Sequence, residues 1–214
     1  MQYEEAFVTG CDYSCEWMLA WWIKNYKQHN SKPIIFANFG VTELMLSIAR
    51  ENFDAVMDLS KAEERGWFKK PKAMLHSPAK KTVWIDTDCE ILTDIGDIFD
   101  LLKPDKLNMV EDKPWSKRRG EDWHNSGVVG FIDKPYILKL WTQAIKDNPI
   151  IGDQETLHTI LSPITKLKYI NELPNEYNWL RVQMENDQED TQFKKIIHWT
   201  GYKGKERIRA KING

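Results

Sequence analysis

The sequence predicts an α/β fold in which a central, mostly parallel mixed sheet is flanked by helices. Up to Asp86, short apolar segments alternate with segments whose apolar residues recur at helical spacing. This alternation is typical of βαβ units and a parallel sheet. Beyond Asp88 the rhythm changes, because two strand-like segments are joined by a polar one. The length of 214 residues favours a single domain, since domains usually hold roughly 100–200 residues.

The first half of the chain, residues 1–105, holds the regular alternation. We expect strands at 6–10, 33–40, 53–59 and 82–86, and helices at 11–30, 42–50 and 67–77. Gly10 and Gly40 are expected to stop the first two strands as turn glycines. The helices are predicted from the spacing of their apolar residues, and Pro71 interrupts the third one near its start.

The second half, residues 106–214, is less regular. We expect strands at 106–112, 127–133, 166–170 and 195–199, helices at 135–146 and 153–161, and a loop at 115–125. Asn125 and Ser126 stand in a small polar break before an apolar strand. The last segment, GYKGKERIRAKING, is a basic tail that contains glycine.

Composition limits the partners and the compartment. The net charge of −2 gives no global reason to expect nucleic acid or an anionic membrane as a partner. No apolar run approaches the roughly 18 residues of a membrane span, and the first residues lack a leader pattern. The three cysteines have no paired spacing, which argues against a disulfide framework or a zinc site. We therefore expect a cytoplasmic protein.

The segment TVWIDTDCEIL, residues 82–92, reads as a buried strand that ends in acidic residues. Asp86 and Asp88 share a face because they are two residues apart, at the strand end where α/β sheets bind ligands. Their repulsion, about 4 kcal/mol near 4 Å at an effective dielectric of 20, requires a proton, a basic side chain or a metal ion. Oxygen ligands suit Mg²⁺ or Mn²⁺. The alternative is a solvated turn in which one aspartate caps a helix. Glu90 is interpreted as a solvated loop acid.

The same segment resembles the D-x-D segment of GT-A-fold nucleotide-sugar glycosyltransferases, in particular glycosyltransferase family 8, the glycogenin-like retaining enzymes. Other stretches resemble that family in the same order: FVTGCDYSC, KKPKAML, HNSGVVGF, IGDQETL and IIHWTGYKG. The resemblance runs from Phe7 to about Lys205. It implies a single GT-A, Rossmann-like domain over 1–214. It also implies transfer of a sugar from a UDP-sugar to a hydroxyl of a glycan, protein or small-molecule acceptor, with retention of anomeric configuration.

The resemblance implies a metal site of Asp86, Asp88 and His198, where Asp86 also touches the ribose. This set of carboxylates and an imidazole suits Mn²⁺, with Mg²⁺ as the alternative. Without the D-x-D segment, His198 would be interpreted as a strand-end histidine packed beside Trp199. Thr87, between the two aspartates, is placed among the residues that bind the donor.

The resemblance also implies basic residues at the diphosphate. Lys70 is the upstream candidate and Lys72 its alternative, although charge clusters usually form solvated helix faces. The family's last motif reads H-x-x-G-x-x-K-P-W, so Gly201 matches, but Gly204 stands at the lysine position and no Pro-Trp follows. Lys203 is the candidate and Lys205 the alternative. The basic tail either closes over the diphosphate, touches an anionic surface or stays solvated.

The first strand and its loop would hold the uridine through Thr9, Gly10, Asp12 and Tyr13. Asp12 would accept a hydrogen bond from the uracil imide, and Tyr13 would stack on the ring. The alternative for Asp12 is a helix N-cap, and both roles can coexist.

Asn125 and Ser126 would form hydrogen bonds to the donor sugar or to the acceptor, and Asp153 and Gln154 would face the sugar. Asn125, Asp153 and Gln154 are the predicted catalytic group. Asn-Ser-Gly also favours a turn, and Asp153 also suits an N-cap. A double displacement needs a carboxylate nucleophile, and these motifs offer no obvious one, so we expect substitution on the same face. The rival functions are a haloacid-dehalogenase-type phosphohydrolase, with Asp86 as its nucleophile, and a non-catalytic module that binds a sugar nucleotide.

Overall fold

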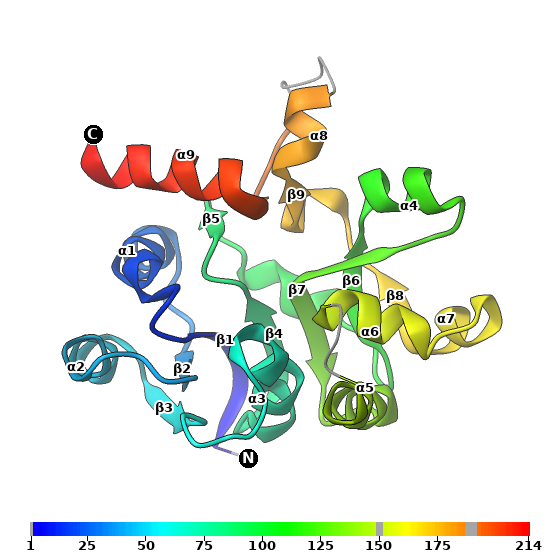
Figure 1. Cartoon of the computed structure of the whole chain (residues 1–214), viewed down its shortest axis with the longest axis horizontal. Helices are drawn as coiled ribbons and strands as arrows, with labels where there is room; N and C mark the ends of the chain where they lie inside the picture. Colours follow the sequence, from blue (N-terminus) through cyan, green and yellow to red (C-terminus); the bar gives the residue numbers. More distant parts are fainter. Residues whose placement is uncertain (1, 149–151, 187–191) are drawn as a thin grey trace.

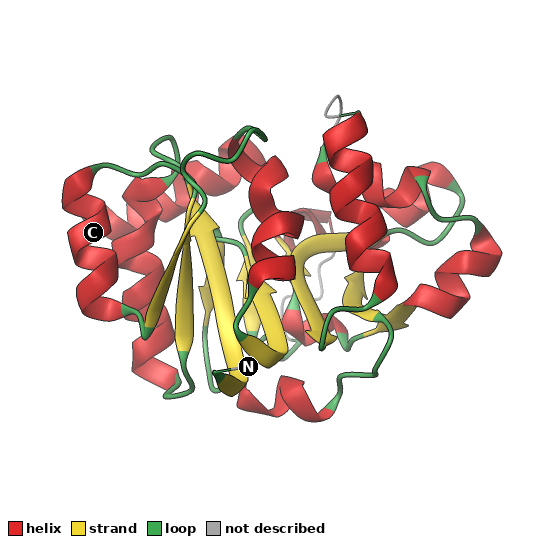
Figure 2. Ribbon diagram, turned by 90° about the horizontal axis from the view of Figure 1, so that it is seen from below, coloured by secondary structure: helices red, strands yellow, loops and turns green. Residues whose placement is uncertain are grey.

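A seven-stranded mixed sheet forms the centre of the protein, and helices cover both of its faces (Figures 1 and 2). The computed structural model describes residues 2–148, 152–186 and 192–214. In spatial order the strands are β3 Ala55–Asp58, β2 Ile34–Asn38, β1 Tyr3–Cys11, β4 Ala79–Ile85, β7 His124–Ile132, β6 Leu107–Glu111 and β8 Ile170–Glu172. The predicted class is confirmed. Strands β1 to β4 pair in parallel, whereas β7 is antiparallel to both of its neighbours.

Both faces of the sheet are buried, because successive side chains of a strand point to opposite sides. The covering helices are α1 Leu19–His29, α2 Glu43–Asn52, α3 Lys70–His76, α5 Tyr136–Asp147 and α6 Asp153–Thr159. Phe7 and Val83 pack in a core with residues of α1 and α2. Val8 and Trp84 pack in a second core with residues of α3, α5 and α6. Burial on both sides explains why the strands read as almost continuous apolar runs.

A small second sheet returns the end of the chain to the segment that follows β4. It consists of β5 Cys89–Ile91, β10 Ile196–His198 and β9 Trp179–Leu180. Strand β10 is antiparallel to β5, so that His198 pairs with Cys89. Two helices, α8 Arg181–Asn186 and α9 Gly201–Asn213, flank this sheet (Figure 1). The fold therefore brings His198 next to Asp88, 110 positions earlier in the chain.

Two predictions for the second half were wrong. The expected loop at 115–125 contains helix α4 Lys113–Arg119, which Asp112 caps by accepting from the Trp115 amide and which ends at Gly120 with φ of +70°. The expected strand at 166–170 is mostly the last turn of α7 Pro163–Tyr169, and β8 begins only at Ile170. In both places a capping residue before a proline, Asp112 or Ser162, marked the start of a helix.

Other positions were assigned to the wrong local structure. Gly10 is not a turn glycine. It lies inside β1, where a Cβ atom would stand 2.6 Å from the Ala37 carbonyl oxygen, so close strand packing requires glycine. Asn125 and Ser126 belong to β7 itself and not to a break before it. The basic tail is helix α9.

The remaining elements are single turns of 3-10 helix: η1 Glu16–Met18, η2 Gly66–Lys69, η3 Gly96–Asp100 and η4 Asn175–Tyr177. Ile151, the first residue of the motif IGDQETL, lies outside the described residues. Within the described ranges, none of the helices combines the length and the apolar character needed to cross a bilayer.

Candidate active site

The sheet topology gathers the candidate side chains at one end of the central strands, where β1 and β4 finish. Strands β1 and β4 are parallel, so the residues that follow them, Asp12 and Asp86, lie on the same side of the sheet. Strand β7 runs the opposite way, so its first residues meet the end of β4, and the Asp86 amide donates to the Gly127 carbonyl at 2.8 Å. A cavity of about 360 Å³ opens at this end, where α/β sheets commonly bind ligands.

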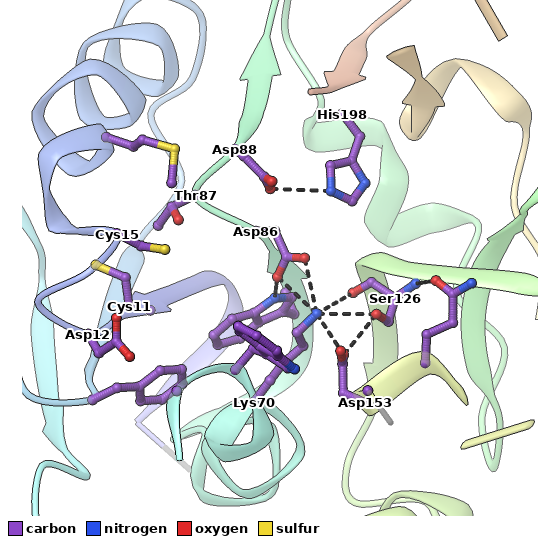
Figure 3. Close-up of a pocket in the computed structure, with 18 of the residues that line it drawn as sticks. Cys11, Asp12, Cys15, Lys70, Asp86, Thr87, Asp88, Ser126, Asp153 and His198 are labelled. Atoms are coloured by element: carbon purple, nitrogen blue, oxygen red, sulfur yellow. Dashed lines mark hydrogen bonds and ion pairs between the residues drawn. The ribbon is translucent and has the colours of Figure 1, made fainter. Parts of the chain in front are cut away.

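A buried lysine, Lys70, joins two carboxylates in this cavity (Figure 3). Its Nζ atom lies 3.0 Å from the Asp86 carboxylate and 2.8 Å from that of Asp153. It also donates to the Ser126 carbonyl at 3.1 Å and hydroxyl at 3.2 Å. Burial alone would lower the pKa of Lys70, but the charges of Asp153 and Asp86 outweigh it and raise the pKa. The ammonium therefore remains charged although its side chain is only 3% exposed.

The three lysines of the KKPK segment have different environments. Lys70 is the first residue of α3 and faces the cavity. Lys72 pairs with Glu64 at 3.0 Å and does not line the cavity. The Lys69 ammonium donates to three backbone carbonyls at 2.9–3.2 Å, which ties together the loops after β2 and β3. Of the two predicted candidates, only Lys70 is in a position to act in the cavity.

The Asp86 carboxylate is held by its own strand as well as by Lys70. The Trp84 indole, two residues earlier on the same face of the chain, donates to Asp86 Oδ1 at 2.6 Å. Burial raises the pKa of Asp86, Lys70 opposes this, and the negative charge of Asp88 adds to it. The D-x-D repulsion expected from the sequence is therefore present, and Lys70 partly offsets it.

Asp88 lies opposite His198, whose Nε2 atom is 3.2 Å from Asp88 Oδ1 (Figure 3). The other ring nitrogen, Nδ1, lies 3.0 Å from Asn125 Oδ1 and 3.2 Å from Asn178 Oδ1. The orientation of the Asn125 amide is fixed because its Oδ1 also accepts from the Gly127 amide at 2.9 Å. Two acceptors at Nδ1 require this nitrogen to carry the proton. In the neutral ring, Nε2 then directs a lone pair at a carboxylate.

This pair of facing acceptors fits a cation. A histidine whose Nδ1–H is bound to amide oxygens is oriented for coordination through Nε2, and a carboxylate with an imidazole suits Mn²⁺. Without a metal, the two acceptors can form a hydrogen bond only if His198 Nε2 takes up a proton and donates it to Asp88. Burial lowers the pKa of His198, but the charge of Asp88 outweighs it and raises the pKa. Burial likewise would raise the pKa of Asp88, but the charge and hydrogen bond of His198 lower it.

Cys89 stands beside this pair, and its sulfur, Asp88 and His198 have ligand atoms within 4.8 Å of one another. The thiol is fully buried, and burial raises its pKa well above the usual value, with further increases from Asp88 and Asp86. A protonated thiol is a poor metal ligand. The ligand set that the residues support is thus Asp88 and His198. Asp86, predicted as a third ligand, is not in the group whose ligand atoms lie within 4.8 Å of one another, and its carboxylate is bound by Trp84 and Lys70.

A hydrogen-bond network behind His198 fixes the predicted sugar-binding residues. Asn125 Nδ2 donates to Asp112 at 3.0 Å and to Gln154 Oε1 at 3.0 Å. Gln154 Nε2 donates to the same Asp112 oxygen at 3.1 Å. The Ser126 amide donates to Gln154 Oε1 at 3.2 Å. Asn125, Ser126 and Gln154 all line the cavity, so they reach it with their orientations already set.

Asp153 does not cap its helix, because Gly152 occupies the N-cap position of α6. The Asp153 carboxylate instead accepts from Lys70 and from the Ser126 hydroxyl, both at 2.8 Å. The N-cap alternative for Asp153 is wrong because Gly152 is the N-cap. The turn alternative for Asn125 and Ser126 is wrong because both residues lie in β7.

The glycine of the N-S-G motif allows His198 to approach β7. A Cβ atom at Gly127 would lie 2.3 Å from the imidazole Cε1 and Nδ1 atoms. Any side chain there would displace the ring from Asp88. The motif is thus explained by the packing of a histidine far along the chain.

The opposite end of the cavity contains Gly10 and Asp12. Asp12 Oδ1 accepts from the Ser14 amide at 3.0 Å and from its hydroxyl at 2.6 Å. It closes a turn and does not cap η1, whose N-cap is Cys15, so the capping alternative was wrong. Thr9 is fully buried inside β1 and is not among the residues that line the cavity.

Aromatic residues at this end are placed differently from the prediction. Tyr13 is 72% exposed and does not line the cavity. Trp67 of η2 lines it and is 60% exposed, although the sequence had indicated only a helix there. Thr87 also lines the cavity, and in Figure 3 its side chain points away from the Lys70 cluster.

Helix α9 reaches the cavity with Lys205, whereas Lys203 is exposed and does not line it. Gly201 begins the helix with φ of +71°. Gly204 packs against the chain before it, since a Cβ atom there would lie 2.0 Å from the Trp199 carbonyl oxygen. Lys205 also contributes to lowering the pKa of Asp88. Of the two predicted lysines, the alternative Lys205 is the one that faces the site.

Glu90 is not a solvated loop acid. It is 8% exposed in β5, where its carboxylate accepts from the Trp199 indole at 2.8 Å and from Lys211 at 2.9 Å. The Lys211 ammonium also lies 5.5 Å from the Trp199 ring. Glu90 thus fastens the end of α9 to the strand that follows the D-x-D segment.

Several site residues were missed from the sequence. They are Trp84, Asp112, Asn178, Trp67 and Glu155. Trp84 could have been found, since strand residues two apart share a face with Asp86. Asn178 is fully buried. It could not have been found, because no local sequence pattern indicates its contact with the distant His198.

Comparison with solved structures finds this fold in glycosyltransferases. The glycosyltransferase GlyE of Streptococcus pneumoniae TIGR4 matches with a TM-score of 0.67 and 18% identity, over 94% of this chain and 55% of GlyE. The galactosyltransferase LgtC, solved with donor and acceptor sugar analogues, gives 0.64 and 12%, over 92% of this chain and 87% of LgtC. Mouse xyloside xylosyltransferase 1 gives 0.57 and 12%, over 92% and 97%.

At these identities the likeness establishes the GT-A fold. The chain spans about half the length of GlyE. No protein-family model matches the sequence, and no curated protein matches it.

Proposed function

We propose that this protein is a metal-dependent glycosyltransferase that moves a sugar from a UDP-sugar to an acceptor hydroxyl with retention of configuration. The observation that carries the proposal is the pair of acceptors formed by Asp88 and His198 at 3.2 Å, beside the buried Lys70 cluster. A site that combines a cation-binding pair with fixed ammonium groups suits a diphosphate. The fold shared with glycosyltransferases supports the same assignment.

The donor's leaving group would be bound by positive charge. Asp88 and His198, with Asp86 beside them, would hold Mn²⁺ or Mg²⁺, which when bound neutralises charge on a departing diphosphate. Lys205 lines the cavity and replaces Lys203 as the residue proposed to contact the diphosphate. Lys70 keeps Asp86 and Asp153 in place, so the site is preorganised before the donor arrives.

The sugar would lie against Asn125, Ser126 and Gln154. Among the described residues, five carboxylates line the cavity. Asp86 and Asp153 are paired with Lys70, and Asp88 faces His198. Asp12 is bound to Ser14, and the Glu155 carboxylate is turned onto Gly152. These pairings lower the nucleophilicity of each group. They support a same-face substitution in which the leaving phosphate oxygen accepts the proton of the acceptor hydroxyl.

The uracil would lie at the end of the cavity that Asp12 and Trp67 line. One Asp12 oxygen is occupied by Ser14, and the other stands near Gly66, 3.2 Å from where its Cβ atom would be. We propose that this second oxygen accepts from the uracil imide. Trp67 takes the stacking role that had been expected of Tyr13.

The phosphohydrolase alternative requires Asp86 as a free nucleophile. Its carboxylate is instead bound by the Trp84 indole at 2.6 Å and by Lys70 at 3.0 Å, which opposes attack on phosphorus. Incubation with simple phosphoesters should therefore release no inorganic phosphate.

Two measurements separate the transferase from a non-catalytic binding module. A thermal-shift titration with UDP and Mn²⁺ should raise the melting temperature, and UDP-sugars should then release UDP. A rise in melting temperature with every donor tested, but no UDP release, would favour the binding module.

The stereochemistry is tested by proton NMR of fresh product. A retained anomeric configuration is expected. An inverted anomer would contradict the same-face mechanism and the resemblance on which it depends.

A further inference from the structure

Helix α4 stands beside the sugar end of the cavity and carries more positive charge than the donor requires. Trp115 of α4 lines the cavity together with Gly152 and Glu155 at the start of α6. The sequence of α4, KPWSKRR, contains four basic residues and no acidic one. The basic residues are Lys113, Lys117, Arg118 and Arg119.

The two arginines are held on an aromatic stack. The guanidinium carbons of Arg118 and Arg119 lie 5.2 and 4.8 Å from the Trp115 ring centre. Arg119 also lies 5.2 Å from the ring of Trp123, which stacks on Trp115 at 5.5 Å. Such cation–π contacts restrain a guanidinium and leave its N–H groups free. Among the residues that the structure describes, neither arginine forms an ion pair.

The position of α4 is tied to the donor site. One oxygen of Asp112 caps the helix by accepting from the Trp115 amide at 3.1 Å. Its other oxygen accepts from Asn125 at 3.0 Å and Gln154 at 3.1 Å. The Ser116 hydroxyl accepts from the Trp123 amide at 2.9 Å, which closes the chain behind the helix. The arginine pair is therefore fixed relative to the residues proposed to bind the sugar.

Two acids that follow α4 or line the cavity with it, Glu121 and Glu155, are engaged elsewhere. Glu121 is bound to Lys166 at 2.9 Å and to the Trp123 indole at 3.2 Å. Glu155 folds back over Gly152, where a Cβ atom would meet its carboxylate at 2.2 Å. The diphosphate already has Lys205, which lines the cavity, whereas the Lys70 ammonium is taken up by Asp86 and Asp153. None of the four basic residues of α4 lines the cavity, so they are not placed to hold the donor.

We propose that the acceptor is a saccharide that carries an anionic group, a carboxylate or a phosphate, which Arg118 and Arg119 bind. The inference rests on the proposed function and names the substrate class of its acceptor. Guanidinium groups match carboxylate and phosphate through paired hydrogen bonds. They stack on Trp115, which lines the cavity, so the two guanidinium groups lie just outside it. A neutral saccharide leaves this pair without a partner.

The test is a glycan array of matched triplets, each with a neutral sugar, its uronic acid and its 6-phosphate, probed with the protein in UDP and Mn²⁺. Acidic members should bind about tenfold or more better than their neutral partners, since charge-assisted hydrogen bonds are worth that much or more. The triplets show whether carboxylate or phosphate is preferred. The double variant Arg118→Ala/Arg119→Ala should lose the preference, with circular dichroism confirming its fold.

Arg50→Ala is the matched control, because Arg50 is an exposed arginine at the end of α2, and it should keep the preference. An array on which acidic members are not enriched, including one with no bound member, overturns the inference. So does a preference that survives in the double variant. If UDP-sugars are hydrolysed while the preference is absent, only this inference fails, whereas absence of any hydrolysis defeats the proposed function itself.

Discussion

At the scale of single residues, buried charges decide which of several candidates can act. The sequence offered Lys70 or Lys72 and Lys203 or Lys205, since local spacing could not distinguish them. The fold distinguishes them by position, because Lys70 and Lys205 line the cavity and Lys72 and Lys203 do not. Glu90 was misjudged for the same reason, because its partners Trp199 and Lys211 lie more than 100 positions away.

Replacement of Lys70 tests the central cluster. Lys70→Met should abolish UDP release and lower the free energy of unfolding by about 3–5 kcal/mol, the usual cost of breaking a buried ion pair. It leaves Asp86 and Asp153 buried without their cation. The measurement is urea unfolding together with a UDP-release assay, and Lys72→Met is the control. A Lys70→Met protein of parental stability and activity would contradict the role of the cluster.

Asn178 should act through His198 without touching substrate. Asn178→Ala removes one acceptor at the Nδ1 atom of His198, 3.2 Å away, and so loosens the ring orientation. Partners of metal-binding histidines contribute about 10–100-fold to metal affinity. Calorimetric titration of Mn²⁺ in the presence of UDP should therefore show a dissociation constant for Mn²⁺ that is larger by that factor. Asn148→Ala, at an exposed site, should bind Mn²⁺ as the parent does; equal affinities in both variants would exclude the orienting role.

At the scale of elements, helix starts and strand packing decided what could be predicted. The strands and helices of the first half follow from their apolar periodicity, which matches both buried faces of the sheet. Helix α4 was missed because seven residues are too short for a periodic pattern, and its signal was only the cap at Asp112. Strand β10 was expected at 195–199, but its partners β5 and β9 were missed, because strands of two or three residues depend on tertiary pairing.

Helix α9 should be held in place by Glu90. Glu90→Gln keeps a group that can accept from Trp199 but removes the ion pair with Lys211 at 2.9 Å. The KM for the UDP-sugar should rise several-fold while kcat changes less, because Lys205 reaches the diphosphate from α9. Lys211→Ala should produce the same shift, and combining the two changes should add little. Additive or absent effects would show that the contact does not position the helix.

At the scale of the whole molecule, two buried histidines should make stability depend on pH. Burial lowers the pKa of His124 and of His158 to about 4, below the unfolded value of about 6.5. Protons then bind more tightly to the unfolded state. The contribution of the two neutral histidines to the free energy of unfolding is therefore fully present above pH 6.5 and is lost as the pH falls toward 4. Between pH 7 and pH 5, each histidine should lower the free energy of unfolding by about 2 kcal/mol. The raised pKa of His198 acts in the opposite direction.

Urea unfolding in EDTA at several pH values checks this expectation. Stability should fall by a few kcal/mol from pH 7 to pH 5, and His158→Gln should flatten the profile. His76→Gln, at an exposed position, should leave it unchanged. A parent profile that stays level over this range would contradict the assignment of the two histidines as buried and neutral.

The fold class was predictable because it follows from the alternation of strands and helices and from motifs in a fixed order. The site was predictable only in part. The sequence identified Asp86, Asp88 and His198, but the order of contacts around them depends on β7 running antiparallel to β4. That arrangement brings Asn125 to His198 and Ser126 to Lys70, and no local pattern encodes it.

The most direct test of the account is UDP release from a panel of UDP-sugars, measured with Mn²⁺, with EDTA and with the Asp88→Asn variant. We expect at least one donor to yield UDP with Mn²⁺, and we expect EDTA to abolish the release and added Mn²⁺ to restore it. We also expect that Asp88→Asn, which folds as the parent does, releases none. Full activity in EDTA or in Asp88→Asn would contradict the metal site of Asp88 and His198, and no UDP from any donor would contradict the proposed transferase.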